Sequence, residues 1–168
     1  MKIKSTYTDS DGRKIDYIYY EGIDPTKDLK GRNLKGVHAF CFCGDKFVLV
    51  YANKTKKWTP PGGGIEKGET YEEAVIREVK EESNMKVLHQ ELIGFCDFYE
   101  PTGITRTTRS FCIVEPYGPF VSDPDGDITE IKLIDPKDYK QYFDWQSVGD
   151  RIMKKAVELN KKSTIELC

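Results

Sequence analysis

The sequence predicts an α/β layered domain in which helices cover a mixed sheet, and three observations support this prediction. Apolar and polar residues alternate through much of the chain with the period of two that is typical of strands. Turn residues separate these runs, and one helical pattern interrupts them near the middle of the chain. A second helical pattern follows near the end. Strands on both sides of a central helix indicate a layered α/β fold.

Length and composition fit one globular domain. The chain has 168 residues, of which 38% are hydrophobic and 32% are charged, and this balance does not resemble a disordered segment. The 26 basic and 28 acidic side chains leave a net charge of -2, without the basic surplus expected of a nucleic-acid-binding chain. No apolar run reaches the roughly 20 residues that span a bilayer. We therefore expect a single cytoplasmic domain over 1–168, with neither a membrane nor a nucleic-acid polymer as partner and with a homodimer left open.

The cysteines agree with a reducing compartment. They form an odd set without the C-x-x-C spacing of a zinc knuckle, and the chain has only two histidines. Four of the five stand among apolar neighbours. We therefore expect buried thiols in place of a disulfide framework or a zinc site; the five are Cys41, Cys43, Cys96, Cys112 and Cys168.

Most of the expected elements are strands. Residues 1–21 predict an N-terminal β-hairpin extension around the polar turn 9–12, whose Gly12 can adopt a positive φ. Residues 22–35 are polar and predict a surface connection. A second hairpin is expected over 37–43 and 47–51, and further strands are expected over 88–99, 107–114 and 129–134.

Two helices are expected. Thr70 and Glu73 form a T-x-x-E capping box at the start of a helical pattern that continues to about Ser83. The second helix shows helical spacing from Trp145 to Leu159, and Asp135-Pro136 predicts a short helical turn before it.

The central helix carries a cluster of acids. At 100° per residue, Glu82 lies about 40° from Glu78, and Glu81 lies about 60° from Glu78 on its other side. Like charges at such spacings repel one another, and hard oxygen ligands beside a glycine-rich segment suit Mg²⁺ or Mn²⁺. The alternative is an ordinary charged surface helix stabilised by i,i+4 ion pairs.

The spacing around these acids distinguishes the two interpretations. Gly63, Glu69 and the run Arg77-Glu78-Val79-Lys80-Glu81-Glu82-Ser83-Asn84-Met85 resemble the Nudix box, G-x5-E-x7-R-E-U-x-E-E-x-G-U, where U is aliphatic. The approach Trp58-Thr59-Pro60-Pro61-Gly62 is similar too. The sequence departs from the box at Asn84, where the family has Gly. Asn tolerates the left-handed conformation that commonly ends a helix, so we expect the turn to survive.

The resemblance, of the MutT-like type, implies a Nudix α/β/α sandwich with a mixed sheet, a catalytic loop-helix-loop and a C-terminal helix. It implies a pyrophosphohydrolase that uses Mg²⁺ or Mn²⁺. Glu78, Glu81 and Glu82 match the metal-binding carboxylates, and the carbonyl of Gly62 matches a backbone ligand. Arg77 and Glu69 match the pair that orients the catalytic glutamates. A further acid from a late loop is also implied, for which Asp125, Asp127 and Glu130 are candidates.

The expected substrate is a small nucleotide: a nucleoside diphosphate linked to another group. A nucleoside triphosphate is the first candidate, and ADP-ribose or a nucleotide-sugar is the alternative. Tyr99-Glu100-Pro101 resembles a feature of ADP-ribose hydrolases, but a proline also simply ends a strand. A nucleotide sensor without turnover is the non-enzymatic alternative. Arg106 and Arg109 are expected to hold phosphates, and the candidates for stacking a base are Trp58, Phe98, Tyr99, Tyr51 and Phe40.

Overall fold

Strands dominate the fold and join into one sheet. A computed structural model describes residues 1–163, in which the strand order is β1-β2-β7-β8-β3-β4-β5, with β6 paired to β3 and β9 paired to β4. The β3–β8 pair is parallel and the other pairs are antiparallel, so the sheet is mixed as expected. The strands are β1 (Lys2–Thr8), β2 (Lys14–Glu21), β3 (Arg32–Cys43), β4 (Lys46–Ala52), β5 (Lys57–Thr59), β6 (Gly62–Gly64), β7 (Met85–Glu100), β8 (Gly103–Pro116) and β9 (Ile128–Ile134).

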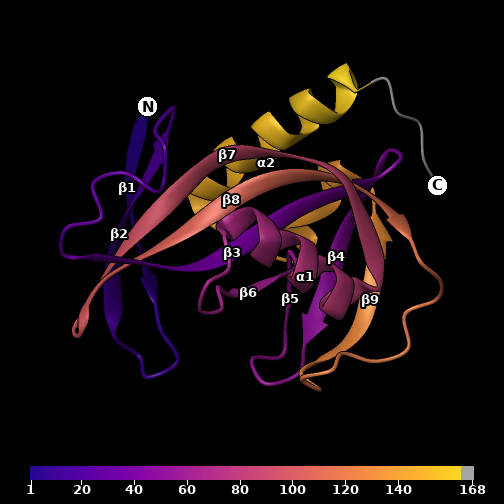
Figure 1. Cartoon of the computed structure of the whole chain (residues 1–168), viewed down its shortest axis with the longest axis horizontal. Helices are drawn as coiled ribbons and strands as arrows, with labels where there is room; N and C mark the ends of the chain where they lie inside the picture. Colours follow the sequence, from indigo (N-terminus) through magenta and orange to yellow (C-terminus); the bar gives the residue numbers. More distant parts are fainter. Residues whose placement is uncertain (164–168) are drawn as a thin grey trace.

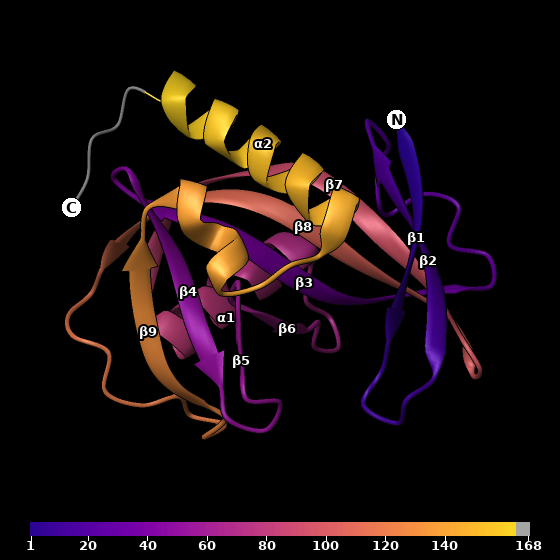
Figure 2. The same ribbon diagram turned by 180° about the vertical axis from the view of Figure 1, so that it is seen from behind.

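The two α-helices cover opposite faces of this sheet. Figure 1 shows α1 (Tyr71–Ser83) in front of the strands, and Figure 2 shows α2 (Gln146–Lys162) on the other side. Val37 and Ala39 of β3 pack into the cluster that contains Val75 of α1. Phe40 of β3 packs into the cluster that contains Ile152 of α2. Because side chains alternate along a strand, β3 supplies both halves of the core.

The ends of α1 follow the expected chemistry. The Thr70 side chain accepts a hydrogen bond from the Glu73 backbone N–H at 3.1 Å, which satisfies a donor of the first turn. Asn84 ends the helix with φ 54° and ψ 40°, the left-handed conformation that was expected. The short turn before α2 also forms as expected: the 3₁₀-helix η1 (Pro136–Gln141) begins after Asp135, whose side chain accepts from the Lys137 N–H.

The expected N-terminal hairpin is present and extends the main sheet. β1 and β2 pair along their length, and β2 continues the sheet by pairing with β7 (Figure 1). Three strands are longer than expected, because β7, β8 and β3 continue through polar residues that carry no clear alternation. The predicted connection over 22–35 therefore ends in β3, which begins at Arg32.

Two further expectations concern the membrane and the thiols. None of the helices within residues 1–163 combines the length and hydropathy needed to cross a bilayer. Cys41, Cys96 and Cys112 are buried free thiols as expected. Cys43 is disulfide-bonded, which corrects the expectation of a free thiol there, and Cys168 lies outside the described residues.

Candidate active site

The glycine strand β6 presents its backbone to α1. Ala39 N–H donates to the Pro61 carbonyl and Ile65 N–H donates to the Lys35 carbonyl, both at 2.8 Å. Since bonded and non-bonded pairs alternate in an antiparallel ladder, Gly62 and Gly64 occupy positions whose polar groups point away from β3. Two bonds from α1 agree with this: Gly62 N–H donates to Glu82 Oε1 at 2.8 Å, and the Gly64 carbonyl accepts from Arg77 Nη2 at 2.7 Å.

Gly63 allows the helix to approach this closely. A Cβ atom at Gly63 would lie 2.4 Å from Oε1 of Glu78, inside any permitted contact. A Cβ atom at Gly64 would meet nothing nearer than 3.8 Å. The sequence was interpreted as a glycine-rich loop here, and it instead forms a short edge strand, because glycines carry no side-chain alternation from which a strand is recognised.

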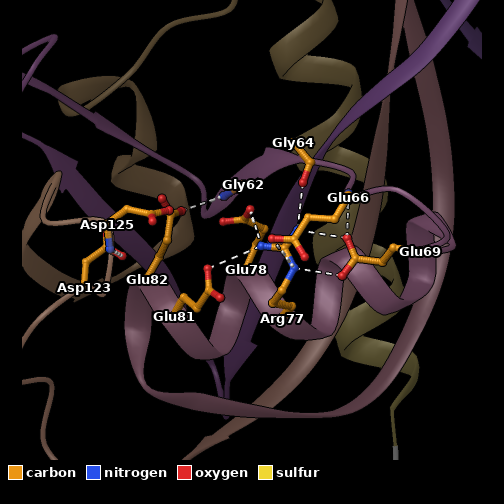
Figure 3. Close-up of polar contacts among 10 residues, drawn as sticks. All are labelled: Gly62, Gly64, Glu66, Glu69, Arg77, Glu78, Glu81, Glu82, Asp123 and Asp125. Atoms are coloured by element: carbon orange, nitrogen blue, oxygen red, sulfur yellow. Dashed lines mark hydrogen bonds and ion pairs between the residues drawn. The ribbon is translucent and has the colours of Figure 1, made fainter.

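Arg77 organises the acids of α1 (Figure 3). Its Nε and Nη2 donate to the two oxygens of Glu69 at 2.8 Å and 2.9 Å, a bidentate pair that fixes the plane of the guanidinium. Nη1 then donates to Glu78 Oε1 at 2.8 Å and to Glu81 Oε2 at 3.3 Å. Glu69 itself accepts from the Glu66 N–H at 3.0 Å. Arg77 and Glu69 thus lie where they can orient Glu78 and Glu81, as the resemblance implied.

Two of the acids lie in a strongly negative, partly desolvated environment. Burial raises the pKa of Glu78 above its usual value, and Arg77 offsets this only in part. Burial raises the pKa of Glu82 to about 8, with further repulsion from Glu78, Asp123 and Asp127, against the opposing hydrogen bond from Gly62. Carboxylates that resist ionisation when alone are the groups that gain most from a bound cation.

The donor set fits a hard divalent cation. It consists of carboxylate oxygens with a backbone carbonyl facing them, the chemistry that Mg²⁺ and Mn²⁺ favour. Among residues 1–163 no three His, Cys, Asp or Glu side chains are already gathered around one point. Glu78 turns toward Arg77 and Glu82 toward Gly62, so the two carboxylates have separate protein partners from which an ion would draw them.

The acidic residues of the segment 123–130 lie in different environments. Asp123 is buried and shapes the loop by accepting from the N–H groups of Asp125 and Ile128, both at 3.1 Å. Asp127 accepts from the Lys54 N–H at 2.8 Å. Asp125 is exposed and close enough to Glu78 to raise its pKa. Glu130 is an exposed residue in the middle of β9, opposite Tyr51.

The structure separates the two arginines expected to bind substrate. Residues three apart in a strand point to opposite faces. Arg106 is 4% exposed, pairs with Asp97 at 2.7 Å and donates to the carbonyls of Pro25 and Lys27. Its donors are committed to anchoring the segment before β3, which corrects its expected substrate role. Asp97, which also pairs with Arg32 at 3.0 Å, was not identified from the sequence.

Arg109 lies on the other face and lines a cleft of about 630 Å³. The cleft lies between the glycine strand β6, the hairpin β1–β2 and the start of α2. Of the five aromatic candidates for stacking a base, only Phe98 lines it. Trp58 packs on Tyr51 with ring centroids 5.3 Å apart, and Phe40 is core. Trp145 and Tyr17 line the cleft and were not considered for it, because their roles depend on contacts distant in sequence.

Comparison with known proteins agrees with this geometry. The model of the NUDIX domain matches residues 32–156. A Bacillus subtilis (strain 168) protein described as the uncharacterized Nudix hydrolase YvcI is 35% identical over 54 residues, which span 32% of this chain and 34% of that protein. The chain therefore belongs to the NUDIX family. Its class is that of the Nudix hydrolases, pyrophosphohydrolases that generally use divalent metal cations and act on nucleotide substrates.

Solved structures show the same fold. A mutant of the Bacillus subtilis pyrophosphohydrolase BsRppH has a TM-score of 0.71 at 21% identity, covering 96% of this chain and 99% of that chain. The MutT protein from Bacillus halodurans has a TM-score of 0.56 at 20% identity, covering 74% and 82%. A C. elegans Ap4A hydrolase has a TM-score of 0.53 at 22% identity, covering 76% of this chain and 99% of that chain. The expected family, fold and enzyme class are confirmed.

Proposed function

We propose that the chain hydrolyses the diphosphate bond of a nucleoside diphosphate linked to another group, with a nucleoside triphosphate as the first candidate substrate. The observation that carries the proposal is the contact between β6 and α1. Gly63 leaves room for Glu78, while Gly62 N–H holds Glu82 at 2.8 Å. Two carboxylates with raised pKa values are thereby held beside an accessible glycine backbone.

In this proposal Glu78, Glu81, Glu82 and the Gly62 carbonyl hold Mg²⁺ or Mn²⁺. When bound, the cation neutralises phosphate oxygens and acidifies water. Water attacks one phosphorus and the bridging oxygen leaves with the other phosphoryl group, so one P–O bond forms as another breaks. A carboxylate accepts the proton that the water loses. Arg77 and Glu69 keep Glu78 and Glu81 oriented throughout.

Asp125 is proposed as the acid contributed from outside the helix. It is exposed and raises the pKa of Glu78 by repulsion. Asp127 accepts from the Lys54 backbone and acts electrostatically on Glu82, so it is the second candidate, whereas Glu130 lies in β9 opposite Tyr51 and has the least support. Asp125→Asn should therefore lower activity more than Glu130→Gln does.

The ADP-ribose alternative has less support. Pro101 lies in the turn between β7 and β8, where Glu100 faces Gly103, so its position is explained by the end of a strand. A nucleotide sensor without turnover would not need Glu78 and Glu81 to be oriented by Arg77 and Glu82 to be held by Gly62. A cytoplasmic location is part of the proposal. We propose no nucleic-acid polymer or membrane as partner and leave a homodimer open.

A panel of nucleotides tests the function. Nucleoside triphosphates, ADP-ribose and nucleotide-sugars are incubated with the protein and Mg²⁺ or Mn²⁺, and the products are separated by chromatography. Release of nucleoside monophosphate and pyrophosphate from a triphosphate is the expected result. Turnover that persists in excess chelator would contradict metal dependence, and binding without turnover of any substrate would favour the sensor.

A further inference from the structure

The cleft connects to the acids across the glycine strand. In the sheet, Arg109 of β8 pairs with His38 of β3, and His38 pairs with Gly62 of β6. These three residues form a row across two interstrand spacings, roughly 10 Å in all. The row lies on the α2 face, while Glu78 and Glu82 reach β6 from α1 on the opposite face. A substrate in the cleft therefore reaches the acids by passing over the edge at β6, whose three residues are glycines without side chains.

The far end of the cleft is built for a flat ring. Tyr17 of β2 stacks on Phe98 of β7 with ring centroids 5.0 Å apart, and Tyr7 of β1 packs edge-on to Phe98 at 5.6 Å. The Arg109 guanidinium lies 5.1 Å from the ring of Trp145, which directly precedes α2, and 6.0 Å from the ring of Phe98. Tyr7 and Tyr17 belong to the hairpin that precedes residues 32–156, the part matched to the NUDIX domain. The hairpin thus supplies a wall that the domain itself lacks.

Arg109 is a buried cation with unused capacity to donate. It is 4% exposed, and among residues 1–163 it forms no ion pair with a carboxylate. Nη1 donates to the Thr108 carbonyl at 3.1 Å, whereas Nε has no partner. A buried donor without an acceptor is costly, and a buried charge more so, unless a ligand completes the site. His38 beside it does not compete as a cation, because burial and Arg109 lower its pKa to about 3.

The surroundings of Arg109 favour a base over a phosphate as its ligand. Glu100 and Asp144 also line the cleft, and their carboxylates repel a polyanion. Lys35 lies at the other end, where its backbone carbonyl accepts from Ile65 directly after the glycine strand. Lys35 and Lys57, which line the cleft together with the glycine strand, are therefore the cations left for the phosphates, and the aromatic end is left for the nucleoside.

We propose that this cleft binds the nucleobase of the substrate and that Arg109 selects bases with a carbonyl on the edge that faces it. Guanine, hypoxanthine and uracil offer an acceptor oxygen where adenine and cytosine carry an amino donor. An amino group at that position would place a hydrogen-bond donor against the N–H donors of the guanidinium. The inference rests on the proposed function and adds its specificity: keto bases over amino bases, with the hairpin β1–β2 as part of the specificity site.

Two pairs of nucleoside triphosphates, each differing in one oxo or amino group, test the inference. ITP and ATP differ at the 6-oxo or 6-amino position, and UTP and CTP differ in the same way at position 4. In the wild type, kcat/KM should favour the keto member of each pair by about tenfold or more. In Arg109→Gln both ratios should fall to near one. Arg13→Gln, at an exposed turn residue, is the charge-matched control and should keep the wild-type ratios.

A binding measurement separates this inference from the proposed function. IMP and AMP are titrated into metal-free protein while Trp145 fluorescence is followed, with Trp145→Phe as the control for the second tryptophan. Tighter binding of IMP supports the inference even if no nucleotide is hydrolysed, an outcome that would overturn the function alone. Hydrolysis with equal kcat/KM and equal affinity within each pair would overturn the inference and leave the function standing.

The Arg109→Gln variant has two further informative outcomes. An Arg109→Gln protein that loses kcat/KM equally for all four triphosphates would show that Arg109 holds phosphate, which overturns base selection. If Arg109→Gln does not fold, the wild-type ratios and the IMP and AMP titrations still decide the matter. Tyr7→Ala provides a third check. It should raise KM for every nucleotide and leave the keto-to-amino ratios unchanged, because the Tyr7 ring is proposed to contact the face of the base and not its hydrogen-bonding edge.

Discussion

Glu82 Oε1 accepts a hydrogen bond of 2.8 Å from the backbone N–H of Gly62, twenty residues away in the chain. This bond joins the last turn of α1 to an edge strand that consists only of glycines. It fixes one carboxylate of the site by means of the backbone, while Arg77 fixes Glu78 by means of a side chain. The two acids are therefore positioned independently of one another.

Gly63→Ala should sharply reduce activity. The new Cβ would lie 2.4 Å from Glu78 Oε1 and displace either the strand or the carboxylate. We expect kcat to fall by on the order of 10²-fold or more, since misplacing a catalytic group by about 1 Å has effects of this size. Gly64→Ala is the control, because its Cβ meets nothing nearer than 3.8 Å. Equal activity of the two variants would contradict the close approach at Gly63.

Substitutions at Asn84 test the departure from the family motif. Its left-handed φ of 54° resists a β-branched residue, so Asn84→Val should lower both the melting temperature and the activity. Asn84→Gly relieves strain but loses the bonds from Nδ2 to the carbonyls of Gly118 and Pro119, at 3.3 Å and 3.0 Å. These bonds offset the gain that the sequence alone predicts. We expect Asn84→Gly to lie within about 1 kcal/mol of wild type in unfolding free energy. An unimpaired Val variant would refute the argument.

The stability of the metal-free protein should fall as pH rises. Burial raises the pKa of Glu82 from an unfolded value near 4.5 to about 8. Between these values the native state retains a proton that the unfolded state has lost, so the contribution of this group to stability is complete below pH 4.5 and declines as pH approaches 8. Denaturant unfolding across this range measures the slope. Glu82→Gln should flatten it, and an unchanged slope would contradict the raised pKa.

Magnesium should reverse the same trend. A cation stabilises the ionised carboxylates, so adding Mg²⁺ should raise the melting temperature more at pH 8 than at pH 6. The binding should also release protons, which calorimetry in buffers of different ionisation enthalpy detects. An Mg²⁺ stabilisation that is equal at both pH values would argue against Glu78 and Glu82 as the ligands.

Features encoded by nearby residues were predictable from the sequence. The capping box of Thr70 and Glu73, the left-handed end at Asn84 and the start of η1 at Asp135 all depend on contacts within a few residues. The acids of α1 were predictable because their spacing places them on one side of a helix and matches a long motif. The core was predictable in outline, because β3 alternates between two apolar faces.

Features that depend on distant residues were not predictable. Asp97 pairs with Arg32, which lies 65 residues away, as well as with Arg106, so the anchoring role of Arg106 could not be recognised from its neighbours in the chain. The aromatic wall of the cleft joins β1, β2 and β7, whose register is set by the whole sheet. Strand β6 was missed because glycines show no alternation. These long-range contacts decide which arginine reaches the cleft.

The proposed function requires that Glu82 act in the reaction and not only in the helix. Glu82→Gln preserves shape and can keep the bond from Gly62, but it removes the negative charge. With Mg²⁺ and the best nucleotide substrate, kcat should fall by on the order of 10²–10⁴-fold, while the melting temperature stays equal or rises because repulsion is relieved. Glu72→Gln, at an exposed position of the same helix, is the matched control. A Glu82→Gln enzyme within a few-fold of wild type would show that the acids of α1 are merely a charged surface and would contradict the proposed role of Glu82.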